Sequence, residues 1–283
     1  MSLLAVNKLS VRFGGHRALN EVDLAVEAGQ VTGLIGPNGA GKTTLFNTVC
    51  GVTPPTSGSI RLADRDISGL DTFERARRGI GRTFQRLEVF SSLSVRDNVL
   101  VGLEIRRGWS RRHTPAPQFL AHSRDLKPAD EVDLILDRLA LHAVADQPVG
   151  ALPTGQARLV ELGRALAARP TVLLLDEPAS GLDENETEAF GNLLIELARA
   201  GLGILLVEHD VALVMRVCTD LSVLDFGEII AHGPPERIRT DEAVLTAYLG
   251  GGGDGTRTGA ARRNGTRAGG GRPNGTAAAG GPA

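Results

Sequence analysis

The stretch that decides the fold reads Val31-Thr32-Gly33-Leu34-Ile35-Gly36-Pro37-Asn38-Gly39-Ala40-Gly41-Lys42-Thr43-Thr44. Its first five residues predict a strand, and residues 43–49 have a helical pattern. The glycines between them allow the backbone to curl so that its N–H groups turn inward beside a helix N-terminus. A strand, a glycine-rich loop and a helix in this order predict a phosphate-binding loop.

Side chains of this loop supply groups that a nucleoside triphosphate requires. Lys42 supplies a mobile cation, Thr43 is expected to place its hydroxyl on Mg²⁺, and Thr44 supports the remaining phosphates. A dinucleotide-binding loop needs GxGxxG, whereas this one reads GxxGxG followed by Lys-Thr, so we reject a dinucleotide-dependent dehydrogenase. The residues predicted to contact the nucleotide are Gly36, Pro37, Asn38, Gly39, Ala40, Gly41, Lys42, Thr43 and Thr44.

A second motif, Thr171-Val172-Leu173-Leu174-Leu175-Asp176-Glu177-Pro178, places two carboxylates at the end of an apolar strand. In this Walker B pattern Asp176 is placed to hold Mg²⁺ through its water shell. Glu177, one residue beyond the strand, is placed to polarise the attacking water as a base. An isolated Asp-Glu pair is more often a helix cap or a surface charge. After four β-formers, and beside a phosphate-binding loop, it indicates hydrolysis of the nucleotide.

The composition limits the remaining classes of function. The chain has 283 residues, 42% of them apolar, which suffices for one large core. Its 31 Lys and Arg residues oppose 33 Asp and Glu residues, so the net charge of −2 gives no overall attraction to nucleic acid, and no such partner is expected. Cys50 and Cys218 lack the spacing of a zinc site or a disulfide framework. We read no signal peptide at the N-terminus, and no apolar stretch approaches the roughly 20 residues of a membrane span.

Short β-rich runs alternate with longer helical patterns over residues 3–250, which predicts an α/β fold with a largely buried sheet. The expected buried strands are 31–35, 172–175, 204–207 and 221–224. Residues 104–128 are predicted to form a surface insertion, whose basic cluster 106–113 either grips a membrane partner or is solvated. Helical spacing resumes over 131–141. Residues 251–283, rich in Gly, Ala and Arg, are predicted to be a disordered tail.

Further motifs, in order over nearly all of residues 1–250, resemble the ABC ATPase family. Gln85 in Gly81-Arg82-Thr83-Phe84-Gln85 is similar to its Q-loop glutamine, and His209 in Val207-Glu208-His209-Asp210 to its switch histidine. Phe13 occupies the position of the aromatic residue that stacks on adenine. Taken alone, these would be a surface glutamine, a structural histidine and a core phenylalanine. The resemblance implies that ATP and Mg²⁺ are bound, that Gln85 touches Mg²⁺ and water, and that His209 contacts the γ-phosphate.

The resemblance also implies an architecture. It is a P-loop NTPase core of the ABC ATPase type, with an N-terminal antiparallel β subdomain and an α-helical subdomain inserted at about residues 87–168. The ATPase domain would span residues 1–250.

Two later segments imply a partner. Leu152-Pro153-Thr154-Gly155-Gln156 resembles the family signature, and Ser180-Gly181-Leu182-Asp183 resembles its D-loop. In this family two ATPase domains meet head to tail and enclose ATP between one phosphate loop and the other signature, so a second ATPase subunit, identical or related, is implied. Pro153 replaces the serine of the commonest signature, LSGGQ, whose hydroxyl would contact the γ-phosphate, so backbone amides must supply more of the contacts to that phosphate. The contacts to the opposing subunit's ATP are assigned to Thr154, Gly155, Gln156 and Asp183.

A signature that begins Leu-Pro and ends Gly-Gln is similar to the ATPase subunits of bacterial branched-chain amino-acid importers. The start at residues 11–15 and the close Ala247-Tyr248-Leu249-Gly250 agree with that subgroup. The resemblance implies two transmembrane permease subunits, an extracytoplasmic substrate-binding protein and a place on the cytoplasmic face of the bacterial inner membrane. Related subunits for urea or amide import, or for lipopolysaccharide export, share the framework. A soluble ABC ATPase that acts on DNA or ribosomes is the alternative from a different class.

Overall fold

The computed structural model describes residues 2–109 and 126–250. The strands are β1 (Ser2–Phe13), β2 (His16–Glu27), β3 (Val31–Ile35), β4 (Ser57–Leu62), β5 (Arg65–Asp66), β6 (Ile80–Arg82), β7 (Val172–Asp176), β8 (Gly203–Val207), β9 (Asp220–Asp225) and β10 (Glu228–Gly233). The α-helices are α1 (Lys42–Val49), α2 (Thr72–Arg77), α3 (Val95–Gly108), α4 (Pro128–Arg138), α5 (Thr154–Ala167), α6 (Glu184–Arg199), α7 (Val211–Val217), α8 (Pro235–Ile238) and α9 (Glu242–Gly250). Two short 3₁₀ helices cover His142–Val144 and Val149–Ala151.

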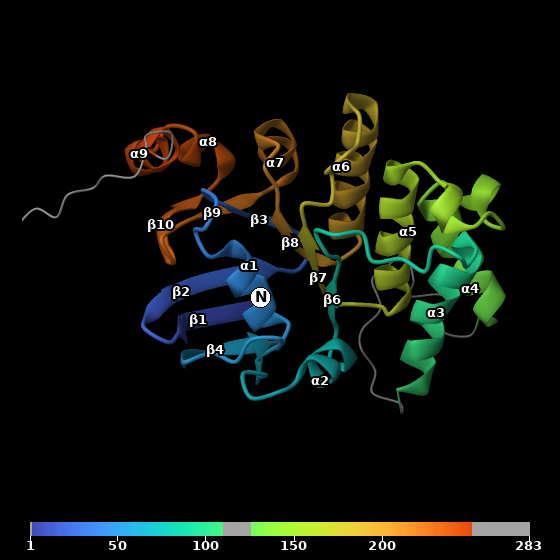
Figure 1. Ribbon diagram of the computed structural model, residues 1–283, viewed down its shortest axis with the longest axis horizontal. Helices are drawn as coiled ribbons and strands as arrows, with labels where there is room; N and C mark the ends of the chain where they lie inside the picture. Colours follow the sequence, from blue (N-terminus) through green and yellow to red (C-terminus); the bar gives the residue numbers. More distant parts are fainter. Residues whose placement is uncertain (1, 110–125, 251–283) are drawn as a thin grey trace, which may run out of the picture. The chain divides into compact units, whose positions relative to one another are not determined.

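Two sheets form the framework (Figure 1). The antiparallel sheet has the strand order β2-β1-β4-β5. The larger sheet has the order β10-β9-β3-β8-β7-β6, in which β9 to β6 run parallel and β10 joins the edge antiparallel. The four strands predicted from apolar runs are β3, β7, β8 and β9, each within one residue at either end. The predicted α/β fold with an N-terminal antiparallel sheet is confirmed.

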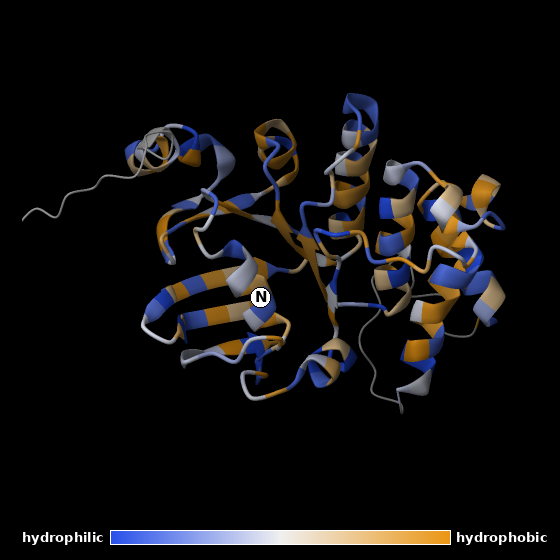
Figure 2. Ribbon diagram, viewed as in Figure 1, coloured by the Kyte–Doolittle hydropathy of each residue, from blue (hydrophilic) through white to orange (hydrophobic). Residues whose placement is uncertain are grey.

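The larger sheet is buried on both faces. Alternate residues of β7 enter different clusters, since Leu173 and Leu175 pack with the helical side and Val172 and Leu174 with β1, β2 and α1. Figure 2 shows the resulting apolar colour along β7 and β8. Strands covered on both faces need such uninterrupted runs. The carboxyl ends of β3, β7 and β8 meet at one edge, and the loops that start there carry the predicted site.

The prediction of a surface insertion beginning at residue 104 was wrong at its start. Helix α3 continues through Gly108, and its buried face, with Val99 and Leu103, extends to Arg106. The Arg106 guanidinium donates to both carboxylate oxygens of buried Glu131 on α4, at 2.7 and 2.8 Å. Arg106 is therefore part of the packing between α3 and α4, because a buried carboxylate needs such a partner.

Residues 110–125 of the predicted insertion, with residues 110–113 of its basic cluster, lie outside the described residues. The predicted tail at 251–283 does as well, so the division of the chain at residue 250 stays a prediction. Helices α3, α4 and α5 pack on one another beside the larger sheet (Figure 1), where the helical subdomain was predicted. Within residues 2–109 and 126–250, no helix combines the length and the apolar content that crossing a bilayer requires.

Cys50 and Cys218 are both buried, at 6% exposure. Burial raises the pKa of the Cys218 thiol to about 12 and also raises the pKa of the Cys50 thiol. Because the thiolate is the reactive form, we expect the folded chain to resist iodoacetamide at pH 8 and to take up two labels only after unfolding. Mass spectrometry of the native and urea-unfolded chains checks this. Rapid double labelling of the native chain would contradict the packing around both thiols.

Candidate functional site

The loop between β3 and α1 is shaped by its glycines. Gly36, Gly39 and Gly41 have φ angles of 152°, 81° and 112°. A Cβ atom on Gly36 would lie 2.0 Å from the backbone oxygen of Leu224, so only glycine fits there. Gly41 is the N-cap of α1, and the helix N-terminus opens directly into the loop. This loop has the form of an anion-binding cradle at a helix N-terminus, as the sequence predicted.

Lys42 lies within this cradle. Its ammonium group donates to the backbone oxygens of Gly36 at 2.6 Å and Pro37 at 3.0 Å. Burial lowers the pKa of Lys42, while the negative charges of Glu177 and Asp176 act to raise it. The predicted phosphate-binding cation and the two predicted carboxylates therefore lie in one electrostatic environment. Thr43 is exposed and Thr44 half-buried.

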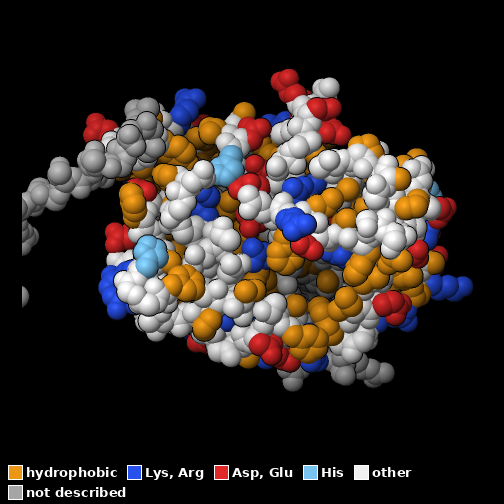
Figure 3. Space-filling model, viewed as in Figure 1, with side chains coloured by type: hydrophobic (Ala, Val, Ile, Leu, Met, Phe, Trp, Pro, Cys, Tyr) orange, Lys and Arg blue, Asp and Glu red, His pale blue; other side chains and the backbone are white. Residues whose placement is uncertain are grey.

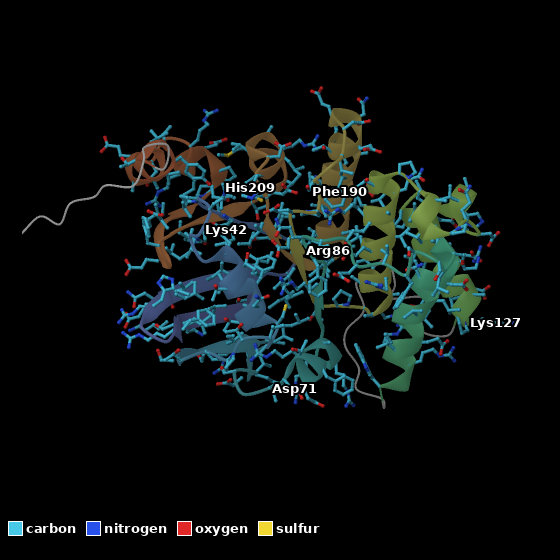
Figure 4. The ribbon with its side chains drawn as sticks, in the orientation of Figure 1. Lys42, Asp71, Arg86, Lys127, Phe190 and His209 are labelled. Carbon is cyan, nitrogen blue, oxygen red and sulfur yellow. The ribbon has the colours of Figure 1, made fainter. Side chains whose placement is uncertain are left out.

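The three predicted catalytic residues meet at Glu177. His209 Nε2 lies 2.7 Å from Glu177 Oε1, and Gln85 Nε2 donates to Glu177 Oε2 at 3.1 Å. Glu177 has a φ of 49°, and its backbone N–H donates to the oxygen of Val207 at 2.8 Å. In Figure 4 the labelled Lys42 and His209 lie close together, and both interact with Glu177. The structure thus brings a candidate base, its two polar partners and the cation to one place.

Asp176 is held by a residue that the sequence analysis did not single out. Arg82, at the end of β6, donates to Asp176 Oδ2 at 3.2 Å and to Asn47 Oδ1 at 2.7 Å. Burial raises the pKa of Asp176, and the Arg82 charge and hydrogen bond act to lower it. The Arg82 guanidinium also lies over the ring of Phe84, 4.8 Å from its centroid. Arg82 therefore links Asp176, α1 and the segment that leads to Gln85.

The segment that carries Gln85 is fixed to α5 by two side chains one turn apart. Arg158 donates to the backbone oxygens of Phe84 at 3.1 Å and Gln85 at 2.9 Å. Glu161 accepts from the backbone N–H groups of Phe84 at 3.2 Å and Glu88 at 3.4 Å. Both side chains are buried. Gln85 is therefore attached to α5, whose first turn contains the signature segment, and its position depends on that helix.

Replacing Arg158 with Ala is expected to lower the free energy of unfolding by about 2 to 4 kcal/mol, because two part-buried carbonyls lose their donor and the buried Glu161 carboxylate loses its cation at 3.9 Å. Arg107→Ala is the control, since Arg107 and Glu104 form a surface pair at 3.5 Å with both side chains more than half exposed. Such a pair contributes about 0 to 1 kcal/mol. Urea unfolding curves measure both variants. An equal loss of stability in the two variants would contradict the conclusion that Arg158 fixes the Gln85 segment to α5.

The residues predicted to contact a second subunit's ATP form a separate group. Thr154 and Gly155 lie in the first turn of α5, where Pro153 is the N-cap. Gly155 is buried against the Glu186 carboxylate, and Thr154 Cγ2 would lie 3.4 Å from a Cβ on Gly181. Asp183 caps α6 by accepting from the Glu186 N–H at 2.8 Å, and Glu186 Oε2 accepts from the Asp183 N–H. The signature and D-loop segments are therefore neighbours. Gln156 is half-buried on the same turn, and the contacts of this group with ATP stay predictions.

Phe13 ends β1, opposite His16 of β2, and is 54% exposed. The alternative of a core phenylalanine is wrong, because the ring lies at the surface. Stacking on adenine stays a prediction.

The sequence of this chain matches known families along most of its length. Residues 19–180 match the family model described as "ABC transporter", and residues 228–254 match that described as "Branched-chain amino acid ATP-binding cassette transporter". The chain is 38% identical over 261 residues to the high-affinity branched-chain amino acid transport ATP-binding protein BraF of Pseudomonas aeruginosa. It is 39% identical over 252 residues to LivG of Escherichia coli K12, which has the same description. Each match covers 88% of this chain and 98% of the relative.

Other relatives extend the comparison. The chain is 37% identical over 250 residues to the lipopolysaccharide export system ATP-binding protein LptB of Escherichia coli K12, again covering 88% of this chain and 98% of the relative. A nucleotide-free ATP-binding cassette from an ABC transporter superposes with a TM-score of 0.75 at 29% identity. The ADP conformation of MJ1267, an ATP-binding cassette of an ABC transporter, gives the same TM-score at 30% identity. Both superpositions cover 88% of this chain and 99% of the other. This chain therefore belongs to the ABC transporter family, as one of its ATP-binding, ATP-hydrolysing subunits.

Proposed function

We propose that the chain hydrolyses ATP to power the import of branched-chain amino acids through membrane subunits. The main support for branched-chain amino acids as the substrate is the match of residues 228–254 to the branched-chain amino acid cassette model. This match is additional to the general ATPase motifs. The names of BraF and LivG agree with it. The observation that carries the chemistry is the placement of Glu177 between His209 and Gln85, beside Lys42.

The geometry suggests a role for each residue during hydrolysis. The loop amides and Lys42 would bind the phosphates of ATP, with Lys42 exchanging its carbonyl partners for phosphate oxygens. Glu177 would orient the attacking water and take up its proton. His209, 51% exposed in its side chain, would bridge Glu177 and the γ-phosphate. These roles need no covalent intermediate, as expected for positioning and electrostatic catalysis of phosphoryl transfer.

The oxygen-rich chemistry of the nearby side chains fits Mg²⁺. The exposed Thr43 hydroxyl, the Asp176 carboxylate and the Gln85 amide oxygen are hard donors of the kind this ion takes together with phosphates and water. Arg82 donates to Asp176 Oδ2, which orients the carboxylate. When bound, the ion would neutralise charge on the β- and γ-phosphates. These three residues are its proposed ligands.

We propose three kinds of partner. A second ABC ATPase subunit, identical or related, would contact the ATP bound here through its counterparts of Thr154, Gly155, Gln156 and Asp183. Two membrane-spanning permease subunits would dock at the apolar surface seen over the α2 and α3 side in Figure 3. Exposed Phe73 on α2 and exposed Phe84, next to Gln85, support this docking site, because exposed apolar surface marks interfaces. An extracytoplasmic binding protein would deliver the amino acid, and the chain would lie at the cytoplasmic face of the membrane.

The 37% identity to LptB favours lipopolysaccharide export as the second candidate function. Urea or amide import is a third within the same framework. A strain that lacks the gene distinguishes them when uptake of labelled leucine, isoleucine and valine is compared with uptake of labelled urea. We expect loss of amino-acid uptake, its recovery with the wild-type gene but not with a Lys42→Ala gene, and unchanged urea uptake. Normal leucine uptake with defective surface lipopolysaccharide would favour the second candidate.

A further inference from the structure

Glu208 is a buried carboxylate that joins two loops of the site. It follows the last residue of β8 and is 6% exposed. Its Oε1 accepts a hydrogen bond from the backbone N–H of Ala179 at 2.7 Å, and its Oε2 accepts one from the N–H of His209 at 3.0 Å. The backbone N–H of Asp210 also acts on this carboxylate, by lowering its pKa. One side chain therefore binds the loop after β7 and the loop after β8 at the same time.

These two loops carry the side chains that pair across the site. Ala179 lies two residues after Glu177, and His209 is adjacent to Glu208. The bond between His209 Nε2 and Glu177 Oε1, at 2.7 Å, depends on the separation of the two backbones. The His209 side chain is half exposed, so packing alone does not fix it. The Glu208 carboxylate supplies the short connection that holds both backbones.

A charged carboxylate at this position is energetically costly, because it is buried and lies near the charge of Glu177. Burial raises the pKa of Glu208 and the charge of Glu177 raises it further, while the three N–H groups act to lower it. A buried charge is costly unless its oxygens are satisfied by hydrogen bonds. Only a carboxylate offers two acceptor oxygens on one side chain, whereas an amide offers one oxygen and one donor. The residue type thus matches the need to accept from both loops.

We infer that Glu208 is a positioning residue that sets the Glu177–His209 pair by tying the Ala179 loop to the His209 loop. This inference rests on the proposed role of Glu177 as the base for ATP hydrolysis. Ala179 also leads into the segment that ends at Asp183 and begins α6. A displacement of that segment would be carried through Glu208 to His209, which links the predicted contact with the second subunit to the reacting groups.

Glu208→Gln tests the inference, because it keeps the size of the side chain and replaces one acceptor by a donor that faces an N–H group. We expect kcat for ATP hydrolysis by the intact transport assembly to fall by about 10-fold to 100-fold, since small misplacements of reacting groups have effects of this size. The KM for ATP should change by less than about twofold, because the phosphate-binding loop is untouched. If this variant does not fold, Glu208→Asp is measured instead, because it keeps the charge and shortens the side chain. The expected result is the same: kcat falls and the KM for ATP stays nearly unchanged.

Glu131→Gln is the matched control. Glu131 is a buried carboxylate of similar exposure, held between helices by Arg106 and Arg169 and not paired with Glu177 or His209. We expect it to lower the unfolding temperature but to leave kcat within about twofold at a temperature where both variants are folded. An equal loss of kcat in the two variants, or an unchanged kcat in Glu208→Gln, would overturn the inference.

A second readout does not depend on turnover. In the isolated chain with ¹⁵N-labelled histidines, the His209 ring signal is identified by its loss in a His209→Ala variant. We expect this signal to shift in Glu208→Gln and to stay in place in Glu131→Gln, since only the first change releases the His209 backbone. An unmoved signal in both would count against Glu208. If the wild-type assembly itself fails to hydrolyse ATP, the proposed function fails while this measurement still decides the role of Glu208.

Discussion

Glu177→Gln is expected to reduce ATP hydrolysis by about 100-fold to 10,000-fold, the range for loss of a general base. Gln has nearly the same shape as Glu and can still accept a hydrogen bond, but it does not take up the proton of the attacking water. The His209 and Gln85 contacts to this side chain show that it is held in place from two sides. ATP should therefore bind normally and remain intact, which we expect to trap two ATPase subunits in a closed, ATP-bound state.

Release of labelled phosphate measures the hydrolysis, and size-exclusion chromatography with ATP measures the closed state. The control is Glu184→Gln, which removes an exposed carboxylate from the first turn of α6 and should leave turnover unchanged. Undiminished turnover in Glu177→Gln assemblies would refute the role of Glu177 as the base. A closed, ATP-bound pair of subunits that forms while turnover stays at the wild-type rate would also refute this role.

Lys42→Ala is expected to weaken ATP binding by at least about 100-fold, since a charged hydrogen bond contributes about 1.5 to 3 kcal/mol and Lys42 would make more than one to the phosphates. The buried ammonium is already directed into the loop, where it bonds to Gly36 and Pro37. Its removal also takes one positive charge away from Asp176 and Glu177, so their negative charges repel the phosphates of ATP more strongly.

Equilibrium titration with a fluorescent ATP analogue measures the affinity. Lys127→Ala is the control, because Lys127 is an exposed lysine just before α4, away from the phosphate-binding loop. We expect its affinity to equal that of the wild-type chain. An affinity for ATP in Lys42→Ala within about threefold of the wild-type value would contradict the assignment of the cradle.

The fold could be predicted where one local signal was strong. The central strands are near-continuous apolar runs because both faces of the sheet are covered, and such runs locate the strand ends to within one residue. The glycine spacing of residues 36–41 reports backbone conformations that other residues rarely adopt. For the same reason, the positions of Lys42 and Glu177 followed from the motif and its place after a strand. The structure adds the distances that join Glu177 to His209 and Gln85.

Residues that act between distant elements could not be predicted in this way. Arg82, Arg158 and Glu208 have no periodic pattern of their own, and their partners lie between about 30 and 90 positions away along the chain. Arg106 was assigned to a surface insertion for the same reason, because its buried partner Glu131 lies beyond the intervening segment. Arg82 lies three positions before Gln85, and Glu208 lies directly before His209. This nearness to a predicted site residue is the sequence signal that could have pointed to them.

The most direct test follows leucine uptake and ATP hydrolysis together, in membrane vesicles that contain the intact transport assembly with either the wild-type chain or the Glu177→Gln chain. We expect labelled leucine to enter wild-type vesicles only while ATP is hydrolysed. The Glu177→Gln chain should stop both processes and still bind ATP. Leucine uptake at the wild-type rate with the Glu177→Gln chain would contradict the conclusion that hydrolysis at this site drives transport.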